Sequence, residues 1–299
     1  MKKILVIMCW AVISSSCNMY EEITSSKDKT HAEATKVYEY TPAPGQFINE
    51  PKMGFDGKQT TAEAAARYAE GRLEKGLDIS LGGFGGYIVV GFDHNVLNFP
   101  QYDFAVMTNA FDGSSEPAVV WVMKDENGNG LPDDTWYELA GSETGKAETI
   151  EGYAVTYYRP SAPKMAVQWG DNLGVSGEIN YLEAHHKQDY YYPEWIEADS
   201  YTLVGTRLKA RSYDDSGDGT YWVNPHFDWG YADNFSPEDF IAKDRSNRFD
   251  ISNAVNARGE RVELDYINFV KVQSAINFQC GWIGEVSTEV RGFKDINFE

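Results

Sequence analysis

The chain has 299 residues, of which 42% are hydrophobic and 14% aromatic, so it can bury a sizeable core and wholesale disorder is excluded. Its 26 basic and 46 acidic residues give a formal net charge of −20. A field of that sign repels nucleic-acid phosphates and anionic lipid surfaces, so we expect no nucleic-acid partner.

The N-terminal residues are typical of a secretory signal. Two lysines precede an apolar run at 4–13, too short to cross a bilayer, and three serines lead to Cys17. This pattern resembles a bacterial lipoprotein cleavage site and predicts removal of residues 1–16 and lipidation of Cys17. The alternative is a secreted protein with an incidental cysteine. Residues 17–36 are polar and aperiodic, which predicts a flexible tether.

One helix is predicted at residues 60–75, where alanines mix with opposite charges at helical spacing. The rest of the chain alternates β-branched and aromatic runs with Gly, Asn, Asp and Pro. This pattern favours an all-β fold, a jelly-roll-like β-sandwich, and we expect residues 37–299 to form a single elaborated domain. Strands are predicted at 87–92, 104–107, 118–123, 153–158, 201–204, 266–272 and 284–290.

Cysteine usage excludes an intramolecular disulfide in the processed chain. Cys9 leaves with the signal and Cys17 is expected to carry lipid, so Cys280 stands alone in an apolar, aromatic segment. We expect Cys280 to be a buried, inert thiol.

The segment DENGNGLPDD at 125–134 has the spacing of a calcium loop. Alternate oxygen-bearing side chains, a glycine at the sixth position and a carbonyl at the seventh suit the hard Ca²⁺ ion. The predicted ligands are Asp125, Asn127, Asn129, Leu131, Asp133 and Asp134. Trp136 stands where a bidentate Glu is usual, and the alternative is a plain hairpin turn between 119–122 and 136–139. At 214–219, similar spacing is better explained by a plain turn.

Two stretches rich in Trp and Tyr, at 190–195 and 221–231, are candidates for ligand binding. Exposed rings form flat platforms for sugars or a planar macrocycle, and neighbouring polar groups would bond the ligand's rim. The alternative is that these rings fill the core. The predicted binding residues are Tyr191, Trp195, Trp222, Trp229, His185, His226 and Asp228.

Several motifs together resemble one family. They are SLGGFGGYIVVGFD at 80–93, YDFAVMTNAF at 102–111, SEPAVVWV at 115–122, DDTWYELAGSE at 133–143, FVKVQ at 269–273 and GWIGEVSTEV at 281–290. The chain resembles jelly-roll cell-surface lipoproteins of Bacteroidetes, some labelled as PKD domain-containing, over residues 37–295. Some relatives occur with outer-membrane nutrient uptake, including capture of vitamin B12. The resemblance implies an outer-membrane, cell-surface location and supplies no catalytic motif.

The resulting hypothesis is a lipid-anchored surface binding protein that captures a nutrient, a glycan or a corrinoid, and passes it to an outer-membrane transporter. Membrane contact is expected only through the lipid. Enzyme signatures such as GxSxG or HExxH are missing from the sequence. Two alternatives stay open: a structural or adhesion module, and a carbohydrate-active enzyme using a carboxylate pair such as Glu285 and Glu289.

Overall fold

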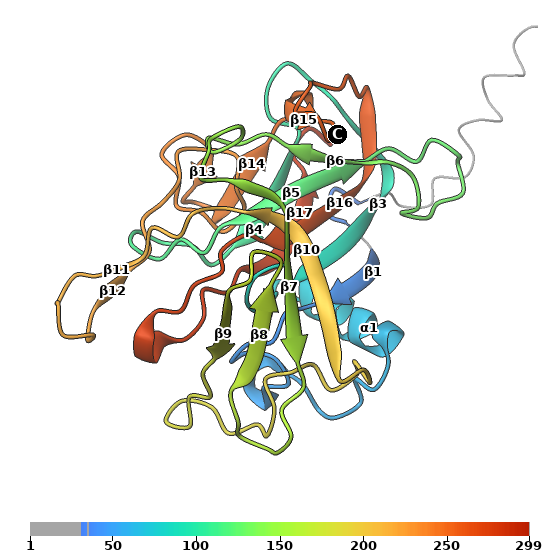
Figure 1. Cartoon of the computed structure of the whole chain (residues 1–299). Coiled ribbons are helices and arrows are strands. Elements are labelled where there is room, and N and C mark those ends of the chain that lie inside the picture. Colours follow the sequence, from blue (N-terminus) through green and yellow to red (C-terminus); the bar gives the residue numbers. More distant parts are fainter. Residues whose placement is uncertain (1–30, 35, 299) are drawn as a thin grey trace, which may run out of the picture. The chain divides into compact units, whose positions relative to one another are not determined.

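The computed structural model describes residues 31–34 and 36–298 (Figure 1). In this part of the chain 17 strands form four antiparallel sheets and a single α-helix is present, which confirms the predicted all-β sandwich. The expected signal, Cys17 and residues 17–30 of the expected tether lie outside the described residues.

A six-stranded sheet lies at the centre of the unit formed by His31–Glu299, with its neighbours drawn from distant parts of the chain. In spatial order its strands are β1 (Lys36–Thr41), β3 (Tyr87–Leu97), β16 (Tyr266–Ser274), β5 (Ala118–Met123), β6 (Trp136–Leu139) and β15 (Ala254–Val255). Strand β5 is apolar along its whole length because both faces are covered. Val120 and Val122 belong to one core cluster, and Val119 belongs to another.

A five-stranded sheet packs on one face of the central sheet, and residues of both sheets share the largest core cluster. Its strands, in spatial order, are β13 (Phe240–Ile241), β14 (Ser246–Phe249), β4 (Phe104–Thr108), β17 (Glu289–Asp295) and β2 (Ile79–Ser80). Strand β17 begins later than the predicted 284–290, because Gly284 has φ +103° and Glu285 makes only an isolated bridge to Gln279. The 3₁₀ helix Gly281–Ile283 precedes it.

A four-stranded sheet adds a further core cluster, and a short hairpin completes the strands. The sheet orders β10 (Ser200–Arg207), β7 (Ile150–Tyr158), β8 (Val167–Asp171) and β9 (Ser176–Ile179). The hairpin joins β11 (Tyr213–Asp214) and β12 (Trp222–Val223), so the turn expected at 214–219 is present. Two further 3₁₀ helices cover Pro51–Met53 and Ile251–Asn253.

The predicted helix is α1 (Ala62–Leu73), which lies beside β1 (Figure 1). The Thr61 hydroxyl caps its first turn by accepting a hydrogen bond from the Ala64 amide at 3.2 Å. The alanines Ala65, Ala66 and Ala69 are buried, because small side chains let the helix approach the core closely.

The folded unit begins before residue 37. The backbone amide of Ala34 donates to the Phe293 carbonyl at 3.1 Å, and the His31 amide lies within hydrogen-bonding distance of the Asp93 carboxylate. Residues 31–34 and the first residue of β1 therefore belong to the folded unit and not to the expected tether at 17–36.

Candidate functional site

The predicted ligand residues of the first aromatic stretch lie in the core. Tyr191 is fully buried and its hydroxyl accepts from the Leu182 amide at 3.1 Å. Trp195 is 7% exposed and packs between Phe55 and Tyr40, with ring centroids 5.8 Å away in each case. Neither ring is placed to stack on a ligand. This part of the prediction is wrong, because the chain around 190–195 runs over the sandwich with its rings inward.

The other predicted ligand residues are dispersed. Trp222 is half-buried against Phe278, and His185 is exposed beside Trp282, with ring centroids 5.6 Å apart. His226 and Asp228 are exposed. Trp229 lines a cavity, and the other six predicted residues lie outside that cavity. The structure therefore does not assemble the predicted set into one binding face.

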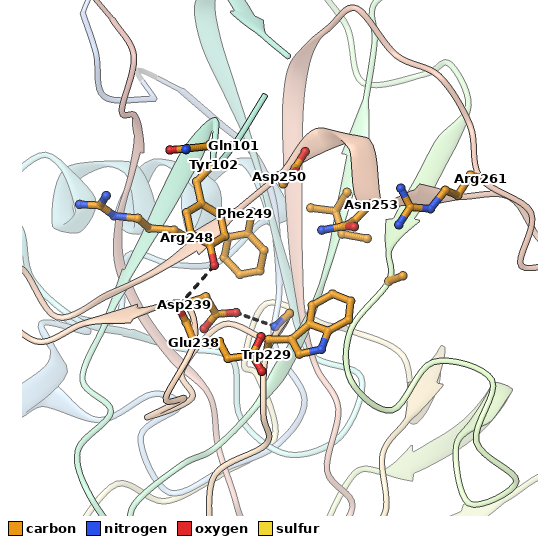
Figure 2. A pocket seen from close by; sticks show the side chains of 13 residues that line it. Gln101, Tyr102, Trp229, Glu238, Asp239, Arg248, Phe249, Asp250, Asn253 and Arg261 are labelled. Atoms are coloured by element: carbon orange, nitrogen blue, oxygen red, sulfur yellow. Dashed lines mark hydrogen bonds between the residues drawn. The ribbon is translucent and has the colours of Figure 1, made fainter. Parts of the chain in front are cut away.

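The cavity beside Trp229 has a volume of about 430 Å³ (Figure 2). Four segments far apart in sequence contribute to it: the end of β6, the loop before β4, the loop carrying Trp229, and the chain from β14 to Arg261. Figure 2 shows the indole of Trp229 below Asn253, with Arg261 on one side and Tyr102 and Arg248 on the other. The labelled lining residues are Gln101, Tyr102, Trp229, Glu238, Asp239, Arg248, Phe249, Asp250, Asn253 and Arg261.

A buried network of hydrogen bonds fixes the backbone at Trp229 and Gly230. The Gly230 amide donates to Asp239 Oδ2 at 2.6 Å, and Asn247 Nδ2 donates to Asp239 Oδ1 at 3.0 Å. The Trp229 carbonyl accepts from the Ser142 amide at 3.0 Å. Gly230 has φ +90°, and a Cβ there would come within 2.4 Å of the Gly141 Cα, so only glycine fits this close approach. The backbone under the indole is therefore firmly placed.

Hydrogen-bonding groups of both kinds face the cavity. The Tyr102 hydroxyl donates to the Glu238 carbonyl at 3.3 Å, and burial, followed by the nearby charges of Asp239 and Glu238, raises its pKa. Arg248 Nε is buried and has no hydrogen-bond partner in the described part of the chain. Glu238 is exposed at the rim and its carboxylate accepts. The site thus offers an aromatic face, donors and acceptors together.

Sequence analysis missed every residue of this cavity except Trp229. Tyr102 lies within a motif of the resemblance, but nothing in that motif assigns it a role. No sequence spacing predicts that Arg248, Asn253 and Arg261 lie near Trp229. They come together with it only through the pairing of β14 with β4 and of β15 with β6.

The predicted calcium loop joins β5 to β6 as a hairpin, with Met123 paired to Trp136. Asp125 already accepts backbone hydrogen bonds: Oδ1 from Gly128 at 2.8 Å, and Oδ2 from Gly130 at 2.8 Å. Asn127 and Asn129 donate their side-chain amides to Asp133, and Asp134 accepts from the Glu126 amide. Leu131 is exposed. The loop is ordered by its own hydrogen bonds, and calcium binding there stays a prediction.

Glu285 and Glu289 do not share a strand face, because Glu285 precedes β17 and Glu289 begins it. Both are buried. Burial raises the pKa of Glu285 to about 8 and that of Glu289 to about 7. Neither lines the cavity beside Trp229. The pair therefore does not flank a sugar-sized cleft in the way that a glycosidase pair does.

Cys280 is free and buried, as predicted, and its thiol donates to Asn224 Oδ1 at 3.3 Å. Burial raises the pKa of the thiol to about 11, which keeps it protonated and unreactive near neutral pH.

A second cavity, of about 370 Å³, lies over the central sheet and shares no lining residue with the first. Trp121, Trp136, Glu138 and Lys271 line it. Burial lowers the pKa of the Lys271 amine and raises that of the Glu138 carboxyl to about 7. Sequence analysis assigned no role to these residues.

The fold and the cavities define an all-β sandwich protein with a solvent-open cavity whose lining combines an aromatic face with polar side chains. Comparison with models of known protein families and with curated proteins gives no match to this chain. Among the described residues no helix combines the length and apolar character that crossing a membrane requires.

Proposed function

We propose that this chain is a lipid-anchored surface protein that binds a nutrient glycan without catalysis, in the cavity beside Trp229. The single observation that carries the proposal is the composition of that cavity. An indole face lies among arginine donors, carboxylate acceptors and the Asn253 amide within about 430 Å³, which falls in the usual range for small-molecule sites.

A neutral sugar matches this lining better than a charged or wholly apolar ligand does. The apolar face of a sugar ring stacks on an indole, and its hydroxyl groups both donate and accept. Arg261 and the Asn253 amide supply donors, while Glu238 and Asp250 supply acceptors. Because the cavity is lined by both positive and negative side chains, it has no strong preference for an anionic or a cationic ligand. A corrinoid is the competing ligand, and the experiment below includes it.

The anchoring half of the proposal rests on the N-terminal sequence. Lipidation of Cys17 would hold the binding unit at the outer membrane through acyl chains, with delivery of the ligand to a transporter as the expected next step. Changing Cys17 to Ala is expected to release the protein from the membrane fraction. Unchanged partitioning of that variant would refute the anchor.

Calcium at residues 125–134 belongs to the same proposal as a structural ion. Asp125, Asn127, Asn129, Asp133 and Asp134 supply oxygen atoms, and Leu131 supplies a carbonyl. Extracellular sites of this kind bind at roughly 10⁻⁴–10⁻³ M, so stabilisation should appear at millimolar Ca²⁺. EDTA and Asp125→Asn should each lower the melting temperature of protein kept in calcium.

The ligand is tested by titrating the purified protein against a panel of neutral mono- and oligosaccharides, with cyanocobalamin in parallel. We expect at least one saccharide to bind wild type and to lose affinity in Trp229→Ala. Trp282→Ala is the matched control, because Trp282 is 51% exposed and lies outside the cavity. Binding of cyanocobalamin alone, or of no panel member, contradicts the glycan assignment.

A further inference from the structure

A row of three side chains crosses the central sheet at the second cavity, the one of about 370 Å³. Lys271 on β16 is paired with Trp121 on β5, and Trp121 is paired with Glu138 on β6. Residues directly opposite each other on neighbouring strands point to the same face of a sheet, and all three residues line the cavity. An amine and a carboxyl group therefore flank one indole.

The two charged side chains do not pair with each other. Two strand spacings separate Lys271 from Glu138, which places their Cα atoms roughly 10 Å apart. Among the described residues no carboxylate oxygen lies within 4.0 Å of Lys271 Nζ. Lys271 Nζ lies instead over the rings of Tyr87 and Trp121, 4.8 and 5.5 Å from their centroids. Glu138 Oε2 accepts a hydrogen bond from the Thr206 hydroxyl at 2.5 Å.

Each of the two groups keeps one polar atom free for a ligand. In the described part of the chain Lys271 Nζ and Glu138 Oε1 make no hydrogen bond, and neither atom is fully enclosed. Desolvation is the largest influence on both groups: it lowers the pKa of the Lys271 amine and raises that of the Glu138 carboxyl to about 7. Because a desolvated charge is costly without a partner, the two groups together favour a ligand that carries both a carboxylate and an ammonium group.

The rest of the lining suits an apolar side chain. The indole of Trp136 lies on β6 two residues from Glu138, and Val204, Val255 and Ala257 add aliphatic groups from β10 and from the end of β15. A volume of about 370 Å³ lies in the usual range for small-molecule sites. The cavity thus combines an aromatic and aliphatic lining with one amine and one carboxyl group on either side of Trp121.

One further acid lines the cavity. Glu151 on β7 is exposed, and its charge contributes to the raised pKa of Glu138. The acids whose charges act on Lys271 are Glu39 and Glu138. Glu151 therefore adds negative charge near Glu138, which favours the ammonium group of a ligand at that side of the cavity.

We propose that this cavity binds a free α-amino acid with an apolar or aromatic side chain. The ligand carboxylate bonds Lys271 Nζ, the ligand ammonium group bonds Glu138 Oε1, and the ligand side chain packs on Trp121 and Trp136. With a charge-assisted hydrogen bond of about 2.8 Å at each end, an α-amino acid spans roughly 8–9 Å, which is comparable with two strand spacings. The site shares no lining residue with the cavity beside Trp229, so it does not depend on glycan binding there.

The test compares L-phenylalanine with two analogues that each lack one charge, by titration calorimetry on the full chain. Phenylethylamine lacks the carboxylate and 3-phenylpropionate lacks the ammonium group, while both keep the ring. We expect L-phenylalanine to bind about ten- to hundredfold more tightly than either analogue, because each analogue leaves one charged group of the cavity without its partner.

Two variants assign the charges to their partners. Lys271→Met and Glu138→Gln each remove one charge with little change in side-chain length, and each should weaken L-phenylalanine binding about ten- to hundredfold. Lys271→Met should also abolish the preference over phenylethylamine, and Glu138→Gln the preference over 3-phenylpropionate. General damage to the fold would not produce this crossed pattern, and melting temperatures measured beside the titrations show that each variant is folded.

Lys209→Met is the matched control, because the Lys209 side chain is 62% exposed and lies outside the cavity. It should leave L-phenylalanine affinity unchanged. The amino-acid site is overturned if L-phenylalanine does not bind wild type, or if either analogue binds as tightly as L-phenylalanine does. Unchanged affinity in both Lys271→Met and Glu138→Gln overturns it as well.

Discussion

The two aromatic stretches are built alike and end up with different roles. In the first, a buried Asn49 donates its amide to the carbonyls of Tyr190 and Tyr192, at 2.9 and 2.8 Å. In the second, a buried Asn234 accepts from the Phe227 amide and donates to the Phe227 carbonyl, at 2.8 and 2.9 Å. One stretch turns its rings into the core, and the other leaves Trp229 at a cavity.

The difference lies in what packs against the rings. Trp195 is covered by Phe55 and Tyr40, which come from the loop before α1 and from β1. Over Trp229 the neighbouring groups are polar or charged and leave space between them. A high aromatic content therefore makes a segment a candidate for either role. The elements that pack against the segment determine whether its rings lie in the core or at a binding surface.

The largest effect is expected for Trp195→Ala. Truncating a buried tryptophan removes its packing and leaves a cavity, which should lower the free energy of unfolding by about 3–5 kcal/mol. Chemical denaturation followed by circular dichroism measures it. A loss below about 1 kcal/mol would mean that the ring is not part of the core.

Asn49→Ala and Asn234→Ala compare the two buried asparagines that hydrogen-bond the backbone of the aromatic stretches. Each leaves buried backbone groups without a partner, so each should cost about 1–3 kcal/mol of stability. Only Asn234→Ala should also weaken saccharide binding, because Asn234 holds the segment beside Trp229. Equal binding losses in both variants would show that the two stretches are not functionally distinct.

Tyr191→Phe tests the core role of the first stretch more finely. The substitution removes the hydroxyl that accepts from the Leu182 amide and keeps the ring. Stability should fall by about 0.5–1.5 kcal/mol, with saccharide affinity unchanged. A selective loss of affinity would restore Tyr191 to the binding site.

Trp222→Phe should have the smallest effect. Trp222 Nε1 is buried and lacks a hydrogen-bond partner in the described part of the chain, so the substitution removes a polar atom that contributes no bond. We expect the free energy of unfolding to change by less than about 1 kcal/mol, in either direction. A larger loss would reveal a bond to Nε1 or packing that phenylalanine cannot replace.

The fold could be predicted because its signals are local. The strands followed β-branched and aromatic runs, and α1 followed from its alanines and the Thr61 cap. Seven strands were predicted in this way, whereas short strands such as β2, β13 and β15 were not, because two residues carry no pattern of their own. The prediction at 284–290 began too early because Gly284 has a positive φ, which no local pattern predicts.

The candidate sites could be predicted only in part, because their residues meet through long-range pairing. Trp229 was found from its aromatic neighbours, but Arg248 and Asn253 were not. Tyr191 was predicted to bind ligand from its aromatic neighbours alone, whereas the segment is irregular and Tyr191 and Tyr192 are both buried.

The central claim is that the ring of Trp229 contacts a bound saccharide and does not hold the fold together. The most direct measurement determines saccharide affinity and the free energy of unfolding side by side for wild type and Trp229→Ala. The account predicts a loss of affinity of about ten- to hundredfold with an intact fold. A variant that loses stability while its folded fraction binds the saccharide normally would contradict it.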